Sequence, residues 1–233
     1  RPCRERSNNP PMPDLSTIVI ATGNPHKVTE LREILAREGL TGVEFVGLAD
    51  VGPTTEPHES GKTFAENATI KALGYAKQTG LPCLADDSGL EVDALQGRPG
   101  VISSHYYNDG RDDGKPREER DALNNQRVLR ELEGIPPEQR SARFVCVMAL
   151  ALPNSPIPAA LTRGTFEGRI GTPPHVPRGS HGFGYDPLFL VAPDFARTSS
   201  ELDPAEKNRL SHRAHAARAM AREIAQLLRR ASS

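Results

Sequence analysis

The chain has 233 residues and a formal net charge of −1 at pH 7. This length can bury a core without disulfides or a structural metal, and it allows one large domain or two small lobes. The balanced charge, with Lys and Arg spread along the chain, gives no sign of a nucleic-acid partner and makes a nucleic-acid-binding module the least favoured class, but it leaves room for a local cationic pocket.

Two absences narrow the class further. No apolar run approaches about 18 residues and the N-terminal segment has no apolar signal core, so we expect a soluble protein without a membrane partner. Cys3, Cys83 and Cys146 are isolated, with no CxxC pair and no His at ligand spacing. This pattern indicates neither a disulfide framework nor a zinc site, and it fits a reducing, cytoplasmic location.

The first residues of the chain are polar and proline-bearing, and a methionine follows them at Met12. We expect a disordered leader or a start-site extension over residues 1–13. Residues 14–233 are then expected to form a single domain.

Residues 17–21 form a short, mostly β-branched run, which predicts a buried strand. Residues 22–25 break it, and from Lys27 apolar side chains recur at helical spacing until near Gly39. A strand, a glycine-containing turn and a helix N-terminus together make an anion site, because the first helical amides are free and the dipole favours negative charge. Lys27 adds a positive charge there. The alternative is an ordinary turn between a strand and a helix.

Residues 44–48 predict a second strand, and residues 63–77 predict a helix after a polar loop. Gly61-Lys62-Thr63 in this loop imitates the end of a Walker A motif. However, Glu56 stands where that motif needs a glycine and no strand leads into it, so a phosphate-binding loop of that kind is excluded. Glu59 is a candidate metal ligand, and the alternative is an exposed, solvated side chain.

Two adjacent carboxylates follow the next apolar run. The run ends at residue 85, residues 86–89 are polar, and alternation from residue 90 predicts a further strand. Acidic residues at the end of a buried strand are costly unless a positive charge meets them, and a divalent cation is the commonest answer. Because successive strand side chains point to opposite faces, Asp86 and Asp87 should not converge, and we expect one to be catalytic and the other structural. The alternative is a polar turn capped by an aspartate.

The middle of the chain predicts regular elements. Apolar spacing from Leu123 to Leu132 predicts a helix that ends at Gly134, and residues 142–152 and 159–170 predict two long strands. The first of these strands is almost continuously apolar, so it should be central in the sheet.

Residues 179–187 are rich in glycine. Their spacing fails as a dinucleotide fingerprint and no helix follows them. Glycines on both sides of Phe183 would let a flat ligand approach its ring, which would make the ring a stacking platform for a base. The alternative is a glycine-rich turn around a core phenylalanine.

The C-terminal segment predicts a capped helix. Asp203 stands as the cap, Pro204 as the first helical residue, and an apolar stripe continues to Leu227. Three side chains that can carry positive charge gather near the start of this helix, namely Lys207, His212 and Arg213. The alternative for these three is surface decoration.

Taken together, the motifs resemble the inosine triphosphate pyrophosphatase family over about residues 18–228. The resemblance rests on five ordered motifs, in residues 22–27, 59–68, 86–90, 182–189 and 207–213. It implies an α/β fold with a long, curved, mixed β-sheet flanked by helices, and two lobes around a central cleft. It also implies a homodimer and a Mg²⁺-dependent hydrolase that cleaves ITP, dITP and XTP to the monophosphate and pyrophosphate, which clears deaminated purines from the nucleotide pool.

The resemblance also assigns roles by motif. Asp87 would be the catalytic acidic residue, as general base or through the metal, with Glu59 beside the ion. The phosphates would be held by Thr22, Gly23, Asn24, Pro25, His26 and Lys27, with Ser88 at the ligand. The base pocket would be lined by Phe183, Gly184, Tyr185 and Asp186, and the base would meet Lys207, His212 and Arg213.

These residue types suit such a reaction. Mg²⁺, Lys27 and the helix amides would neutralise the triphosphate before a water approaches the α-phosphorus. Lys207 and Arg213 can only donate hydrogen bonds, so they favour the keto oxygens of deaminated purines over the 6-amino group of adenine.

One departure from the family pattern lies at residues 103–106, where many bacterial relatives have Ser-Ala-Arg-Tyr and this chain has Ser-Ser-His-Tyr. If that arginine supports the site, His105 weakens the support or makes it pH-dependent. Two alternative functions remain open: a related pyrophosphatase with another base preference, and a catalytically weak nucleotide-binding regulator. The presence of Lys27, Glu59 and Asp87 argues against the regulator, because a pure binder has no use for an acidic metal site beside phosphates.

Overall fold

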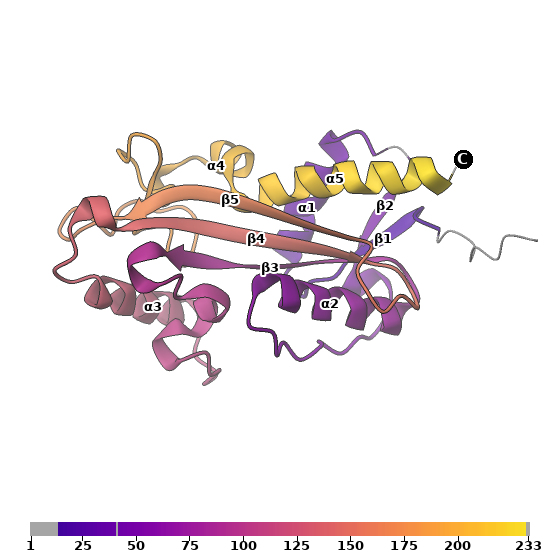
Figure 1. The fold of residues 1–233 in the computed structure, drawn as a ribbon, viewed down its shortest axis with the longest axis horizontal. Helices are drawn as coiled ribbons and strands as arrows, with labels where there is room; N and C mark the ends of the chain where they lie inside the picture. The colour runs from indigo at the N-terminus through magenta and orange to yellow at the C-terminus, as the bar shows by residue number, and fades with distance from the viewer. Residues whose placement is uncertain (1–13, 41, 232–233) are drawn as a thin grey trace, which may run out of the picture.

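The computed structural model describes residues 14–40 and 42–231, so the leader expected over residues 1–13 lies outside the described residues. The described chain builds a six-stranded sheet in the order β2-β1-β3-β4-β5-β6. The strands are β1 Thr17–Ile20, β2 Glu44–Gly47, β3 Cys83–Val92, β4 Ser141–Ala151, β5 Ala160–Ile170 and β6 Phe189–Val191. Figure 1 shows β3, β4 and β5 as long, curved strands that run along the molecule.

The sheet is mixed. β1 pairs in parallel with β2 and with β3, whereas β3, β4, β5 and β6 pair antiparallel in that order. β4 is paired along both edges and almost wholly buried, so the prediction of a central apolar strand is confirmed.

The strand break expected at residues 86–89 is wrong. β3 continues from Cys83 to Val92, and each of its residues has a partner on β4. The two aspartates stay within the strand because cationic side chains meet both of them, Lys27 at Asp86 and Lys71 at Asp87. No turn is then needed to bring the carboxylates to water.

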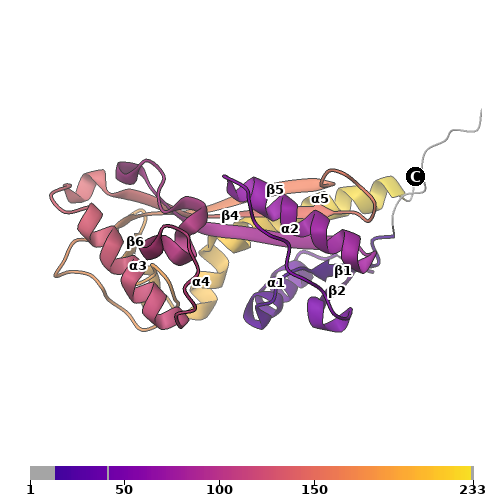
Figure 2. The same cartoon turned by 90° about the horizontal axis from the view of Figure 1, so that it is seen from below.

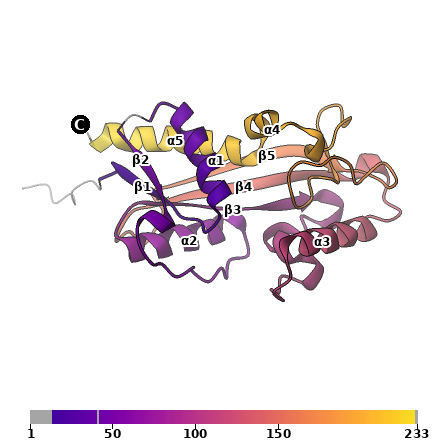
Figure 3. The ribbon, with the colours of Figure 1, turned by 180° about the vertical axis from the view of Figure 1, so that it is seen from behind.

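Helices cover both faces of the sheet at one end. α1 (Pro25–Arg37) and α5 (His212–Ala231) pack on one face, and α2 (Phe64–Thr79) packs on the other. Alternation along β3 divides its side chains between them, since Leu84 packs with α1 and α5 while Ala85 packs with α2. Figure 3 shows α1 and α5 together on their side of the sheet.

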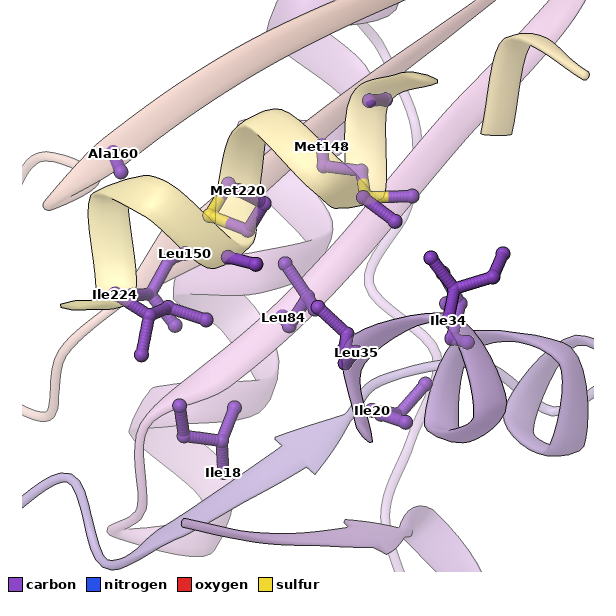
Figure 4. Close-up of a cluster of buried hydrophobic side chains, with 14 of the residues drawn as sticks. Ile18, Ile20, Ile34, Leu35, Leu84, Met148, Leu150, Ala160, Met220 and Ile224 are labelled. Carbon is purple, nitrogen blue, oxygen red and sulfur yellow. The ribbon is translucent and has the colours of Figure 1, made fainter. Parts of the chain in front are cut away.

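The core on this side fixes α5 in place. Met220 and Ile224 of α5 pack toward Met148 of β4, and Leu35 of α1 joins the same buried cluster (Figure 4). Full burial of one such side chain stabilises the fold by about 1.5–3 kcal/mol. The middle of α5 is therefore held firmly against the sheet.

A second cluster closes the other end of the sheet. There the far ends of β3, β4 and β5 pack against β6, α3 (Arg117–Glu131) and α4 (Pro204–Leu210). The ring of Phe189 lies at its centre, 4.6 Å from the Phe144 ring and 5.5 Å from the Phe166 ring between centroids. Figure 2 shows the two ends as separate lobes joined by the long strands. The expected α/β class, with a long curved sheet and two lobes, is confirmed.

The C-terminal segment forms two helices, so the single helix expected there is wrong. α4 begins at Pro204 after the predicted Asp203 cap, and it ends at Leu210 because Ser211 adopts an extended backbone conformation. The Ser211 hydroxyl then accepts a hydrogen bond from the Ala214 amide, which makes it the N-cap of α5. The break distributes the cationic residues expected at one helix start over two helices.

Within residues 14–40 and 42–231, no helix has both the length and the apolar character that crossing a membrane requires.

Candidate functional site

A cavity of about 910 Å³ is lined by residues from both lobes. A cavity of this size suits a nucleotide, since small-molecule sites span about 300–1,000 Å³. Of the residues predicted to bind substrate, the lining contains Thr22, Gly23, Asn24, Pro25, Lys27, Ser88, Phe183, Gly184, Tyr185, Asp186, Lys207, His212 and Arg213. The side chain of His26 lies outside the described part of the structure. The expected cleft between two lobes is therefore confirmed.

The turn between β1 and α1 forms one wall of this cavity. α1 begins at Pro25, and the Thr22 hydroxyl accepts a hydrogen bond from the Asn24 amide in the turn before it. The first amides of a helix have no partner within the helix, and its dipole is positive at that end. The wall therefore combines a helix N-terminus with the ammonium group of Lys27, as an anion site requires.

Two cations converge on Asp86, which is 5% exposed. Lys27 Nζ lies 3.1 Å and 3.0 Å from its two oxygens, and Arg213 Nε lies 3.6 Å from Oδ2. Arg213 also donates through Nη1 to Glu30 Oε2 at 2.9 Å. Burial alone would raise the pKa of Asp86, but the charges of Lys27 and Arg213 outweigh it and hold that pKa well below its usual range. Asp86 is thus an ionised carboxylate that orients two cations of the cavity wall.

Asp87 points to the opposite face of β3, as strand alternation predicts. Lys71 Nζ of α2 lies 3.3 Å from Asp87 Oδ1 and 3.1 Å from Glu59 Oε2, so the two predicted metal ligands share one cation. The other oxygen of Asp87, Oδ2, is buried and has no hydrogen-bond partner in the described part of the chain. Burial, together with repulsion from Glu59, outweighs the opposing effects of Lys71 and of the Asn67 side chain and raises the pKa of Asp87.

The acidic pair stands beside the cavity rather than in its wall. Neither Asp87 nor Glu59 belongs to the lining formed by residues 14–40 and 42–231. Both have close neighbours in the lining, because it contains Ser88, the next residue of β3, and Glu56, from the loop that carries Glu59. The backbone of β3 therefore adjoins the cavity at Ser88, while the Asp87 side chain lies outside the lining, on the face of β3 that α2 covers.

The loop that carries Glu59 is fixed to the start of α2. The buried side chain of Asn67 accepts a hydrogen bond from the Gly61 amide at 2.8 Å, and a Cβ at Gly61 would lie only 2.6 Å from that acceptor. Thr63 and Glu66 complete a capping box at the helix start. The Gly61-Lys62-Thr63 sequence thus serves as a helix cap, which agrees with the exclusion of a Walker A loop.

The glycine-rich segment presents an exposed aromatic ring. Phe183 is 51% exposed, so the alternative of a core phenylalanine is wrong. The carboxylate of Asp186 fixes the glycine-rich segment. It accepts hydrogen bonds from the Phe183 amide and from Ser199 Oγ, both at 2.8 Å, and it pairs with Lys207. Gly182 has a φ of +82° and a Cβ there would clash with the same carboxylate, so this position requires glycine.

His212 contributes a neutral imidazole to the cavity wall. Its ring stacks on Phe144 with 5.3 Å between centroids. Burial, with the charges of Arg213 and Lys207, lowers the pKa of His212 well below its usual value, so the ring is uncharged at neutral pH. A neutral imidazole offers one donor and one acceptor, and Nδ1 of this ring has no partner among the described residues.

His105, where the chain departs from the family pattern, is absent from the cavity lining that the described residues form. Its Nδ1 lies 3.0 Å from Ser104 Oγ, and its Nε2 contacts the guanidinium of Arg120 from α3. Ser103 and Ser104 do line the cavity, and Ser103 Oγ accepts a hydrogen bond from the Leu90 amide at 2.9 Å. The guanidinium of Arg120 from α3 thus lies beside His105, at the position where many bacterial relatives have an arginine.

The sequence-based assignment missed several residues of the site. Lys71 joins the two acids of one face, and Glu30 holds Arg213 on the other. α3 begins at Arg117, more than one turn before the first apolar residue of the predicted helix, and it adds Arg117 and Asp121 to the lining. The sequence signal that could have found Arg117 and Asp121 is the four-residue spacing of these two charged residues at the start of α3.

The residues beside Asp87 suit part of a metal-ligand set. Among the described residues no three His, Cys, Asp or Glu side chains gather as a ligand set. However, Mg²⁺ usually takes only one or two carboxylates and completes its shell with water and substrate phosphates. The unpartnered oxygen of Asp87 beside Glu59 fits this partial ligand set.

The fold and the cavity define an α/β protein with a nucleotide-sized cavity, which has cations at one wall and an exposed aromatic ring at another. Residues 18–223 match the sequence profile of the Ham1 family. The chain therefore belongs to the Ham1 family, and the resemblance found in its motifs is confirmed.

Similar proteins cover nearly the whole chain. The dITP/XTP pyrophosphatase of Frankia alni is 49% identical over 211 residues, which are 91% of this chain and 98% of that protein. The dITP/XTP pyrophosphatase of Geobacillus kaustophilus is 45% identical over 202 residues, covering 87% and 91%. The solved structure of a HAM1 protein from Coxiella burnetii matches with a TM-score of 0.75 at 42% identity, covering 90% of this chain and 98% of that one.

Proposed function

We propose that this chain hydrolyses deaminated purine nucleoside triphosphates, namely ITP, dITP and XTP, to the monophosphate and pyrophosphate. The observation that carries the proposal is the separation of two adjacent carboxylates on β3. Asp86 orients the cations of a nucleotide-sized cavity, and Asp87 stands beside that cavity with an unpartnered oxygen. The names of the relatives support the same reaction.

The phosphates would bind at the β1–α1 wall. Lys27 and the first amides of α1 carry positive charge there, and Ser88 adds a hydroxyl beside them. Lys27 is already oriented by Asp86, so little reorganisation is needed when the triphosphate arrives. Asp87 and Glu59 would hold a Mg²⁺ ion, which supplies charge neutralisation and a more acidic bound water.

In the proposed reaction, a water oxygen forms a bond to the α-phosphorus. The bond from that phosphorus to the oxygen bridging to the β-phosphorus breaks, and pyrophosphate leaves with that oxygen. Asp87 would orient the water and take its proton. A carboxyl group whose pKa is raised is a better proton acceptor than an ordinary aspartate, because its affinity for the proton is higher.

The base would stack on Phe183 and meet donors from α4 and α5. Lys207 and Arg213 only donate hydrogen bonds, so they satisfy keto oxygens and leave the amino group of adenine unpaired. Neutral His212 offers one donor and one acceptor, which suits a ring that carries both a keto oxygen and an N–H. An unpaired buried polar group costs about 1–3 kcal/mol, or roughly tenfold to a hundredfold in rate.

The testing experiment is pyrophosphate release from ITP, dITP, XTP, GTP and ATP, each with Mg²⁺ and with EDTA. Fast release from the first three, slow release from GTP and ATP, and loss of all release in EDTA are the expected results. Binding of ITP without turnover of any substrate would contradict the proposal and identify a nucleotide-binding regulator instead.

The same proposal includes a cytoplasmic homodimer in which residues 14–233 fold as one domain. Light scattering on the purified chain measures the mass directly. A monomer at micromolar concentration would contradict this part of the proposal without affecting the reaction.

A further inference from the structure

The exposed ring of Phe183 is covered on one side by an arginine from α3. The guanidinium carbon of Arg117 lies 4.0 Å from the centroid of the ring. Arg117 is the first residue of α3, lines the same cavity as Phe183, and has a side chain that is 49% exposed. A cation in the first turn of a helix opposes the helix dipole, so helix stability does not explain its position.

The pairing of this arginine with Phe183 is built into the fold. Asp121 and Asn125 follow Arg117 at four-residue intervals and therefore lie on the same side of α3. Asp121 Oδ2 accepts a hydrogen bond from the Gly184 amide at 2.8 Å, and Asn125 Nδ2 donates to the Gly184 carbonyl at 3.0 Å. α3 thus holds both backbone groups of the residue after Phe183, which fixes the ring relative to the helix that carries Arg117.

The spacing leaves no room for a base in the absence of ligand. Stacked carbon atoms sit about 3.5–4.0 Å apart, so a base between ring and guanidinium needs about twice the observed separation. Arg117 can make that space, because among the described residues only a 3.8 Å ion pair with Asp121 and an exposed contact with the ring hold its side chain. Exposed contacts of both kinds are weak.

We propose that Arg117 is the second stacking wall of the base site. Without nucleotide its guanidinium covers Phe183. With nucleotide it moves outward by one layer and stacks on the outer face of the base, which then lies between the ring and the guanidinium. A planar guanidinium can stack in this way, whereas the ammonium of Lys207, 5.4 Å from the ring centroid and paired with Asp186, cannot.

This proposal rests on the proposed function only for the identity of the ligand, so its test measures binding rather than turnover. The probes are inosine 5′-monophosphate, which has the base, and inorganic triphosphate, which has none, each titrated by calorimetry. Arg117→Ala should weaken binding of inosine monophosphate about tenfold, which is within the range for a cation–π contact, and leave binding of triphosphate within about twofold. Arg117→Lys should recover little of the lost affinity, because it restores the positive charge but not the planar group that stacks on the base.

The matched control is Arg130→Ala, which removes an exposed arginine from the far end of the same helix and should change neither affinity. A double-mutant cycle adds the partner ring: in a Phe183→Ala background, Arg117→Ala should lose most of its effect, because the two side chains act on one ligand.

Four results with the variants would overturn the proposal. Unchanged binding of inosine monophosphate by Arg117→Ala would mean that Arg117 does not contact the base. Tighter binding would mean that Arg117 blocks the base site. Equal losses for both probes, or full recovery by Arg117→Lys, would make it a charge that attracts phosphate. If the losses caused by Arg117→Ala and Phe183→Ala are additive, the two side chains do not act together on the base. If the wild-type chain binds inosine monophosphate with this dependence but hydrolyses no triphosphate, the proposed function fails and this inference stands. If it hydrolyses ITP but binds no inosine monophosphate, this inference fails and the proposed function stands.

Discussion

The two faces of β3 treat the same residue type in opposite ways. On the face of α1 and α5, Asp86 is buried between Lys27 and Arg213, and its pKa is held low. On the face of α2, Asp87 shares Lys71 with Glu59, keeps one oxygen without a partner in the described chain, and has a raised pKa. Asp86 has two cationic partners of its own, whereas Asp87 shares its one cationic partner with Glu59.

The difference teaches that environment, rather than residue type, divides structural from reactive carboxylates. A compensated carboxylate is a fixed charge that positions its neighbours, because protonation or movement would break several interactions at once. An under-compensated carboxylate keeps affinity for a proton or a metal ion, which a catalytic group needs. Four predictions break or sharpen this contrast.

The largest effect is expected at Asp87. Asp87→Asn removes the proton acceptor and one metal ligand while keeping the shape, so kcat with ITP should fall by about a thousandfold, within the range for loss of general base catalysis. Binding of inosine monophosphate should stay within a few-fold. Asp194→Asn, at an exposed position, is the matched control for the chemical change. Near-normal turnover of Asp87→Asn would remove Asp87 from the proposed role.

At Asp86 the main loss should be in stability. Asp86→Ala leaves the guanidinium of Arg213 buried without one of its two acids, and breaking a buried pair in this way costs about 3–5 kcal/mol in the free energy of unfolding. Urea unfolding followed by circular dichroism measures it, with Glu138→Ala as the exposed control. A loss below about 1 kcal/mol, the size of an ordinary substitution, would mean that Asp86 is not a structural carboxylate.

A substitution of the exposed Phe183 ring tests whether recognition of the base is independent of the two aspartates on β3. Phe183→Ala should raise KM for ITP by roughly tenfold and leave kcat nearly unchanged, since base–aromatic stacking contributes about 1–3 kcal/mol. A fall in kcat with an unchanged KM would place Phe183 in the chemistry instead. Steady-state pyrophosphate release with ITP gives both constants.

The smallest effect is a pH dependence of opposite sign for the two aspartates. Asp86 has a lowered pKa, so its stabilisation is present above the unfolded value of 3.8 and is lost as the pH falls through the lower folded value. Asp87 has a raised pKa, so it favours the fold at low pH and loses that contribution as the pH rises from 3.8 through its folded value.

Urea unfolding in EDTA across the acidic range measures this pair of slopes. Asp86→Asn should flatten the loss of stability on acidification, and Asp87→Asn should increase stability at neutral pH relative to acidic pH. Changes in slope of the same sign for the two variants, each measured relative to the wild-type chain, would contradict the contrast between the faces.

Local patterns predicted most of the elements and failed at two breaks. The cap at Asp203 and the apolar run of β4 were correct because each depends on neighbours in the sequence. The polar residues 86–89 suggested a turn, yet β3 continues through them because Lys27 and Lys71 supply the missing charge. The serine between α4 and α5 stopped a helix that its apolar stripe predicted to continue, since a side-chain cap outweighs periodicity at one residue.

The sequence by itself determined most of the elements, the order of the motifs and the alternation that sends Asp86 and Asp87 to opposite faces. Only the tertiary structure decided which cation meets which carboxylate, and that Arg117 covers Phe183. The physical reason is that backbone preferences and side-chain periodicity act between near neighbours in the chain. The charge, burial and stacking that set the chemistry of a site depend on elements that only folding brings together.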